Sequence, residues 1–412
     1  MTRPNILFLL IDCLRADAIF SEQRGARTPT LDRLVRSGMA FTQAISSASS
    51  TTPCVASLLT GTYSFEHGIR SIFGLKLNPA VRSLIEAFRE YGYHTYAEVS
   101  GPLFPETSLD RGFDFYHCRE AAAYLSSSWG IDLRQRLRGG AFKLPWLLFL
   151  HVWELHHPRH ILPAFRSRTY GRNRYERAIS SLDAELATLV EALPHNTLVV
   201  LHGDHGERVV KTDIQYRLYR LVRDLLGRKT QKREGHEMDV YEDLIRVPLV
   251  FSSLNGGGQL TLRPGVCDPQ LVRQVDVFPT LLDLVGAPPP PLHGHSLKSA
   301  LFNGTRLHLE AYLEAFLRIR SNPRDRRVGW RTEEWKYIYA PQNPQLPEEL
   351  YHLPSDPRER KNLATRRPDI AALLRSRIET LQRSARATDP GVVMSAEEKA
   401  AIEKRLTDLG YM

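Results

Sequence analysis

Short apolar runs that end in polar residues alternate with helical patterns along most of this chain. The first run, residues 5–11, is followed by Asp12 and has the continuous β-prone pattern of a central strand covered on both faces. Similar runs at 95–99, 146–151 and 197–201 are separated by helical patterns, among them 81–91 and 175–193. This alternation predicts an α/β fold with a doubly wound, mostly parallel sheet and helices on both faces.

The predicted fold divides into two parts. Four consecutive prolines, Pro288 to Pro291, form a stiff connector in the chain of 412 residues. We expect a main catalytic domain over residues 1–290 and a smaller α+β subdomain over 291–412. In the latter, residues 330–339 and 349–353 resemble strands, and residues 369–383 resemble a closing helix.

One basic segment interrupts the strand-helix alternation. Residues 208–233 hold nine Lys or Arg against two Asp, with leucines at helical spacing, and predict a basic amphipathic helix inserted at about 208–234. A solvated helix, a lid over an anionic substrate and a peripheral contact with a membrane or polyanion are all consistent with it. The net charge of +9 is not accompanied by a pattern typical of nucleic-acid readers, so we expect no specific nucleic-acid partner.

The remaining composition narrows the class of protein. Apolar residues make up 42% and charged residues 25%, which excludes collagen-like and disordered chains. The four cysteines lie far apart without a CxxC pair and predict free thiols. The longest apolar runs are too short to span a bilayer, and the N-terminus enters a strand without a signal-peptide pattern, so we expect a cytoplasmic protein.

Acidic and imidazole side chains follow two of the predicted strands. Asp12 ends the first strand, and Asp204 and His205 follow the strand at 197–201. Carboxyl ends of strands are where open α/β sheets bind ligands, so these three side chains are candidates for one metal ion. Oxygen and imidazole ligands suit Zn²⁺ or Mn²⁺ better than Ca²⁺ or Mg²⁺.

A hydroxyl-rich stretch at residues 46–53 supplies a candidate nucleophile. Thr51 lies just before a predicted short helix at 55–61, which Gly61 would stop. Free backbone N–H groups at a helix start can hold an anion, and a divalent cation can activate a hydroxyl at neutral pH. His151, Glu154, His156 and His157 form a second polar group, and His236 follows the basic segment.

Nine segments of the chain follow, in order, the pattern of one known family: 5–17, 28–34, 57–61, 66–68, 151–158, 203–207, 241–249, 276–283 and 349–363. Through them nearly the whole chain resembles the sulfatases of the alkaline phosphatase superfamily. The resemblance implies an alkaline phosphatase-like fold and a hydrolase acting on sulfuric or phosphoric ester bonds.

The nucleophile position departs from the sulfatase pattern. Sulfatases carry Cys-x-Pro-x-Arg or its Ser variant there, and oxidise the first residue to formylglycine. This chain has Thr51 two positions before Pro53 and Val55 at the arginine position, while Cys54 follows the proline. The resemblance therefore implies a direct threonine nucleophile, as in the phosphodiesterases and the phosphoglycerol or phosphoethanolamine transferases of the superfamily.

The metal position departs as well. The family has two adjacent acidic residues at the end of the first strand, whereas this chain has Asp12 followed by Cys13. Thr62 stands where a basic residue often follows the nucleophile helix. By resemblance, Asp12, Thr51, Asp204 and His205 would hold one divalent ion. Glu154, His156 and His236 would either hold a second ion or contact the substrate, so one or two ions are both consistent.

These observations allow three functions. The first is a metal-dependent hydrolase of sulfate, phosphodiester or phosphonate esters through a covalent Thr51 intermediate, acting on a small or polymeric anionic ester. The second is a transferase that moves a phospho group to a sugar or glycerol hydroxyl from the same site. The third is a non-catalytic anion-binding protein on a degraded sulfatase fold. The sequence does not predict the oligomeric state.

Overall fold

The structure is a computed structural model that describes residues 3–209, 235–236, 239–253, 262–316, 323–384 and 392–408. The basic helix predicted at 208–234 lies outside these residues apart from Arg208 and Val209. Within the described ranges, no helix is both long enough and apolar enough to cross a bilayer.

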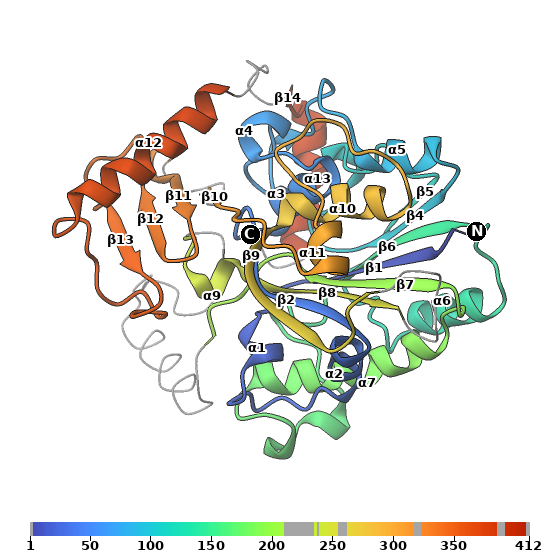
Figure 1. Ribbon diagram of the computed structural model, residues 1–412. Coiled ribbons are helices and arrows are strands. Elements are labelled where there is room, and N and C mark those ends of the chain that lie inside the picture. Colours follow the sequence, from blue (N-terminus) through green and yellow to red (C-terminus); the bar gives the residue numbers. More distant parts are fainter. Residues whose placement is uncertain are drawn as a thin grey trace.

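An eight-stranded sheet forms the centre of the molecule (Figure 1). Its strands are β1 (Asn5–Ile11), β2 (Gly38–Ile45), β4 (His94–Val99), β5 (Phe115–Cys118), β6 (Trp146–Val152), β7 (Thr197–Gly203), β8 (Arg246–Ser253) and β9 (Val266–Arg273). They lie in the order β5-β4-β6-β1-β7-β8-β2-β9, and β8 alone runs antiparallel to both of its neighbours. The predicted doubly wound, mostly parallel sheet is confirmed.

Helices cover both faces of this sheet. All seven residues of β1 are buried, and successive side chains enter different cores. Phe8 packs with α3 (Thr51–Thr60), α5 (Leu84–Glu90), α10 (Val277–Leu284) and α11 (Lys298–Asn303) on one face. Leu9 packs with α1 (Asp17–Phe20), α2 (Pro29–Ser37), α6 (Ser128–Arg138) and α7 (Arg174–Glu191) on the other.

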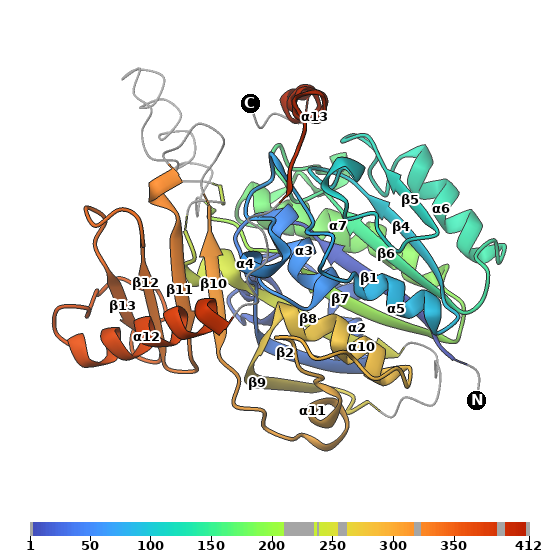
Figure 2. The same ribbon diagram turned by 90° about the horizontal axis from the view of Figure 1, so that it is seen from above.

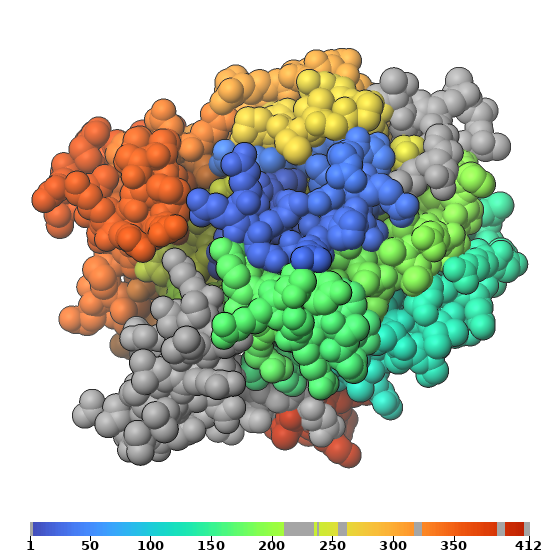
Figure 3. Space-filling view, turned by 90° about the horizontal axis from the view of Figure 1, so that it is seen from below, coloured from blue at the N-terminus to red at the C-terminus, as the bar shows by residue number. Residues whose placement is uncertain are grey.

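Helix α2 begins beside α7, and Figure 3 shows the N-terminal segment in blue next to the green segment on this face. Thr28 occupies the N-cap position of α2, but its side chain does not cap the helix and instead contacts Asp32. The buried carboxylate of Asp183 on α7 accepts the backbone N–H groups of Thr30 and Leu31 at 3.0 and 2.8 Å. A tertiary contact therefore supplies the cap that a local side chain often provides.

The helix next to the polar stretch begins earlier than predicted. Helix α3 starts at Thr51 rather than at residue 55, and all ten of its residues are buried. Gly61 ends it in the left-handed conformation with φ of 65°, as the sequence predicts. Thr51 therefore lies in the first turn, where backbone N–H groups lack helical partners.

A four-stranded antiparallel sheet forms the C-terminal subdomain, and its strands are β10 (Ala311–Ala315), β11 (Arg327–Arg331), β12 (Trp335–Tyr339) and β13 (Glu349–His352). Helix α12 (Pro368–Ser384) covers one face of this sheet (Figure 2). Helix α9 (Glu242–Ile245) contributes Leu244 and Ile245 to the hydrophobic cluster on the other face. The strand predicted at 330–339 is two strands, because the hydroxyl of Thr332 accepts the N–H of Trp335 at 2.9 Å and closes a turn.

Two segments beyond residue 290 pack against the larger part. Helix α11 belongs to the core of α3 and α10. Strand β14 (Val392–Val393) pairs with β3 (Leu75–Lys76), next to α4 (Ser64–His67), and is followed by α13 (Ala396–Asp408). The division of the chain at residue 290 stays a prediction.

Candidate functional site

Two aspartates meet at the carboxyl edge of the central sheet. Strands β1 and β7 are parallel neighbours, and Ile11 pairs with Gly203. The next residues along the two strands are Asp12 and Asp204, both completely buried. Ligand atoms of Asp12, Asp204 and His205 all lie within 4.8 Å of one another. The structure thus brings together three of the residues that the sequence assigned to one metal ion.

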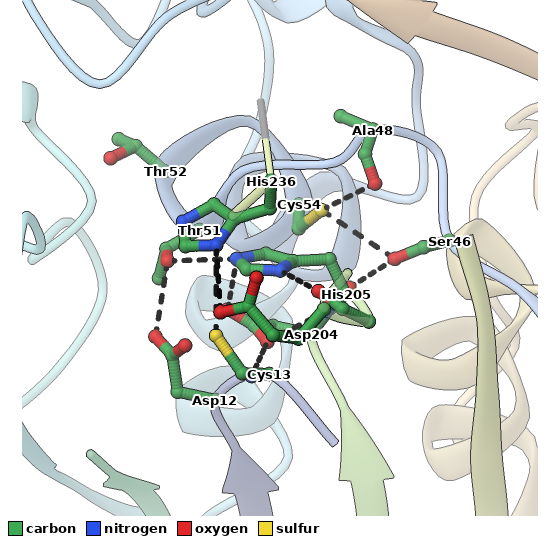
Figure 4. A network of polar contacts seen from close by, with 12 residues as sticks. Asp12, Cys13, Ser46, Ala48, Thr51, Thr52, Cys54, Asp204, His205 and His236 are labelled. Carbon is green, nitrogen blue, oxygen red and sulfur yellow. Dashed lines mark hydrogen bonds and ion pairs between the residues drawn. The ribbon is translucent and has the colours of Figure 1, made fainter. Parts of the chain in front are cut away.

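Thr51 completes this group (Figure 4). Its Oγ1 donates to Oδ2 of Asp12 at 3.2 Å and lies 3.3 Å from Nε2 of His205. Nδ1 of His205 lies 2.8 Å from the carbonyl oxygen of Gly206, an acceptor that leaves Nε2 directed at the hydroxyl. Thr52 points away from the site and donates to the carbonyl of Pro102 at 3.1 Å. The first turn of α3 therefore presents one hydroxyl to the acidic group.

The electrostatics of the two aspartates favour a bound cation. Burial opposes the ionisation of Asp12, but its contact with His151 at 3.4 Å and the charge of His205 hold its pKa below the ordinary value. Burial and then the charge of Asp12 raise the pKa of Asp204. Among the described residues, Oδ1 of Asp12 and Oδ2 of Asp204 accept no hydrogen bond. Burying such oxygens is costly without a positive partner, so the donor set fits a divalent ion.

A second group of possible metal ligands, which includes a soft sulfur donor, lies directly beside the two aspartates. Cys13 Sγ is 3.8 Å from Nδ1 of His236, and ligand atoms of Cys13, His205 and His236 lie within 4.8 Å of one another. Cys13 adopts a left-handed φ of 59°, and its N–H donates to Asp204 Oδ1 at 3.0 Å. Burial and the charge of Asp12 raise the pKa of the Cys13 thiol well above its ordinary value. A cation is what would favour its thiolate here.

Glu207 belongs to the same group, although no role was predicted for it. Its buried Oε2 lies 3.5 Å from Nδ1 of His236. Burial opposes its ionisation, but the contact with His236 and the charge of Arg159 hold its pKa at about 2. The only sequence signal was its place three residues after Asp204.

His156 approaches the site from the loop after β6. Its ring centre lies 5.5 Å from that of His236, and the ring of Trp153 stacks on it at 3.9 Å. Burial lowers the pKa of His156 to about 3. The imidazole is therefore neutral at neutral pH, and it can contact an anion without carrying a charge of its own.

The structure places Glu154 in a different network. Its Oε1 accepts the backbone N–H of Leu125 at 2.8 Å. Burial raises the pKa of Glu185 to about 8, and the negative charge of Glu154 adds to this. In the described part of the chain, neither group of metal-ligating side chains includes Glu154.

An arginine-rich cavity adjoins the site. Its volume is about 880 Å³, and seven of its lining residues are arginines against five acids. One of them, Arg15, donates to the backbone carbonyl of Glu207 at 2.8 Å, and Arg208 is the next residue along the chain. The cavity thus carries a surplus of fixed positive charge close to His236 and Glu207.

The central sheet, the covering helices and the antiparallel C-terminal sheet define an alkaline phosphatase-like fold. The family model described as Sulfatase matches residues 4–287, and the model described as N-sulphoglucosamine sulphohydrolase, C-terminal, matches residues 237–384. Because the first match covers more than half of the chain, the protein belongs to the sulfatase family.

Three known proteins illustrate the range of similarity. Arylsulfatase K of Mus musculus is 27% identical over 220 residues, which cover 50% of this chain and 35% of that protein. The ulvan-active sulfatase of Formosa agariphila is 24% identical over 359 residues, covering 73% and 66%. The crystal structure of the phosphonate monoester hydrolase of Agrobacterium radiobacter superimposes with a TM-score of 0.70 at 18% identity, covering 95% and 100%. The chain thus spans about a third of the length of its arylsulfatase K relative.

Proposed function

We propose that this protein is a metal-dependent hydrolase of sulfate or phosphorus esters, with Thr51 as the nucleophile. The observation that carries the proposal is the position of Thr51 Oγ1, 3.2 Å from Asp12 Oδ2 and 3.3 Å from His205 Nε2. The Thr51 hydroxyl lies between a carboxylate and an imidazole that follow two strand ends, and this placement allows it to act as a nucleophile. Membership of the sulfatase family supports an ester of an inorganic acid as the substrate.

Asp12, Asp204, His205 and Thr51 would hold the cation, since their oxygen and imidazole donors suit Zn²⁺ or Mn²⁺. When bound, such an ion lowers the pKa of the hydroxyl and neutralises the charge of an approaching anion. Cys13, which lies beside His205, adds a soft donor that favours Zn²⁺. His156 and His236 then face the substrate, where their imidazole N–H groups can donate hydrogen bonds to its non-bridging oxygens.

The reaction has two displacement steps. Thr51 Oγ1 loses its proton and bonds to sulfur or phosphorus, the ester bond breaks, and the departing alkoxide takes up a proton to leave as the alcohol. Water then attacks the same sulfur or phosphorus atom, which restores the threonine hydroxyl and releases the inorganic anion or its monoester. The arginine-rich cavity favours substrates that carry further negative charge, such as polymeric anionic esters.

A substrate panel tests the proposal. The metal is removed, Zn²⁺ or Mn²⁺ is restored, and turnover is compared for p-nitrophenyl sulfate, p-nitrophenyl phosphate, p-nitrophenyl phenylphosphonate and bis-p-nitrophenyl phosphate. Thr51→Ala should lower kcat by on the order of 10⁴-fold on any substrate that is cleaved. Thr52→Val is the matched control, because this neighbouring hydroxyl points away from the site.

The panel also identifies the ester. Cleavage of the sulfate alone favours a sulfatase with an unmodified threonine, and cleavage of a phosphorus ester favours a phosphodiesterase-like or phosphonate-hydrolase activity. Undiminished turnover by Thr51→Ala overturns the role of Thr51. If none of the four esters is cleaved with metal bound, the hydrolase proposal is overturned, and a transferase or a non-catalytic anion-binding protein is favoured.

A further inference from the structure

We propose that the C-terminal helix α13 is part of the catalytic apparatus, because it holds Trp153 and thereby positions His156. The inference rests on the proposed function, since it assigns a positioning residue to the same site. Residues 394–406 and the loop that follows β6 contribute side chains to one hydrophobic cluster.

Trp153 lies between two histidines of the site. It is 6% exposed, and its ring stacks on that of His156 at 3.9 Å with an interplanar angle of 20°. The ring of His151, which contacts Asp12, lies 5.8 Å from Trp153 at 63°. A rigid aromatic plane with two side-chain torsions restricts the orientation of both imidazoles.

The backbone approaches the indole very closely at Gly101. A Cβ on Gly101 would lie 2.3 Å from the Trp153 ring, and its φ of 70° also disfavours a side chain. Gly101 therefore leaves just enough space for the indole. With backbone against the ring and His156 stacked on it, a shift of the indole must displace the histidine.

Side chains of residues 394–406 belong to the same hydrophobic cluster as the indole. Trp153 belongs to a small hydrophobic cluster that also contains Ile72, Phe104, Met394, Ile402 and Leu406. Ile402 and Leu406 are completely buried, whereas the other described side chains between them are exposed. Their spacing of four residues presents one narrow apolar stripe of α13 to this cluster.

Polar contacts fix α13 in place. Val392 and Val393 pair with Lys76 and Leu75, and the N–H of Met394 donates to the carbonyl of Gly74 at 3.1 Å. Arg405 forms an ion pair with Glu106 at 3.0 Å. Figure 2 shows α13 standing apart from α12 and the four-stranded sheet. Its described contacts are thus directed toward the main domain and the Trp153 loop.

Point variants of the full chain test this positioning role. Ile402→Ala and Leu406→Ala remove buried atoms of the stripe, and Lys404→Ala is the matched control on the exposed side of α13. We expect each stripe variant to lower kcat by about 10- to 100-fold with unchanged metal content, because small displacements of catalytic groups cost this much. Lys404→Ala should leave kcat unchanged.

A double-mutant cycle shows whether α13 acts through the indole. Trp153→Leu should lower kcat as the stripe variants do, and Trp153→Phe should restore most of it, since a phenyl ring can still stack. Combining Trp153→Leu with Leu406→Ala should add little further loss. Fully additive losses, or melting temperatures that fall while kcat stays at the control value, overturn the inference.

A spectroscopic measurement makes the test independent of turnover. The stacked indole should shift the ¹³Cε1–¹H resonance of His156 through its ring current, and Trp153→Leu should abolish this shift. Leu406→Ala should change it, whereas Lys404→Ala should not. An unchanged resonance in Leu406→Ala overturns the positioning role. Turnover that survives Thr51→Ala in the same assay overturns the proposed function instead.

Discussion

Asp12 and Asp204 lie side by side because Ile11 of β1 pairs with Gly203 of β7 in a parallel register. Burial raises the pKa of Asp204, and the negative charge of Asp12 raises this pKa further, because two carboxylates at this point repel each other. The sheet therefore builds a site that is unfavourable when empty and favourable around a cation.

Asp204→Asn should weaken Zn²⁺ binding by about 100-fold or more, because it removes one ligand charge. The same change should raise the melting temperature of the metal-free protein, since it relieves the repulsion with Asp12. Metal titration and thermal melts with and without Zn²⁺ measure both effects. Asp132→Asn, at an exposed position on α6, is the control. A metal-free protein that is destabilised by Asp204→Asn would contradict the electrostatic argument.

Cys13→Asp should shift the metal preference from Zn²⁺ toward Ca²⁺, because it exchanges a soft sulfur for a hard oxygen. Aspartate tolerates the left-handed backbone of this position, so the fold should be retained. Competition titrations with the two metals give the preference, and Cys267→Ser changes an exposed cysteine as a control. If the ratio of the Zn²⁺ affinity to the Ca²⁺ affinity is unaltered, Cys13 does not contribute to the metal site.

Thr51→Ser should retain turnover within about tenfold of the wild type, since the hydroxyl is kept and only the methyl group that restricts its rotamer is lost. Steady-state kinetics on the best substrate of the panel measure this. A serine variant as inactive as Thr51→Ala would argue that the methyl group, rather than the oxygen, is what the site requires.

Glu185 should make the protein less stable as the pH rises. Burial, reinforced by the charge of Glu154, raises its pKa in the folded state to about 8 from the ordinary 4.5. The folded state therefore keeps a proton that the unfolded state releases, and the free energy of unfolding falls by a few kcal/mol between about pH 5 and 8. Urea unfolding at several pH values measures the slope.

Glu185→Gln removes this titration and should flatten the dependence of the unfolding free energy on pH. Glu191→Gln changes an exposed residue of the same helix and should preserve the wild-type slope. If Glu185→Gln leaves the slope unaltered, then Glu185 is ionised at neutral pH in the folded protein.

Much of the fold could be predicted because its signals are local. Continuous apolar runs of strand length identify buried strands, and their last residues identify the edge of the sheet. Asp12 and Asp204 could therefore be assigned to one place without any structure. The turn that separates β11 from β12 was not predicted, since residues 331–334 contain neither Gly nor Pro, and the turn is closed by hydrogen bonds between Thr332 and Trp335.

The sequence by itself determined the family, the sheet and the strand ends that carry Asp12, Asp204 and His205. Periodicity and strand termini depend on neighbours in the chain, and these are visible in the sequence. The tertiary structure alone decided that the charge of Glu154 acts on Glu185, that Glu207 contacts His236 and that α13 shares a hydrophobic cluster with Trp153. Such contacts depend on how distant elements pack, and short-range sequence patterns do not encode which distant side chain fills the space beside another.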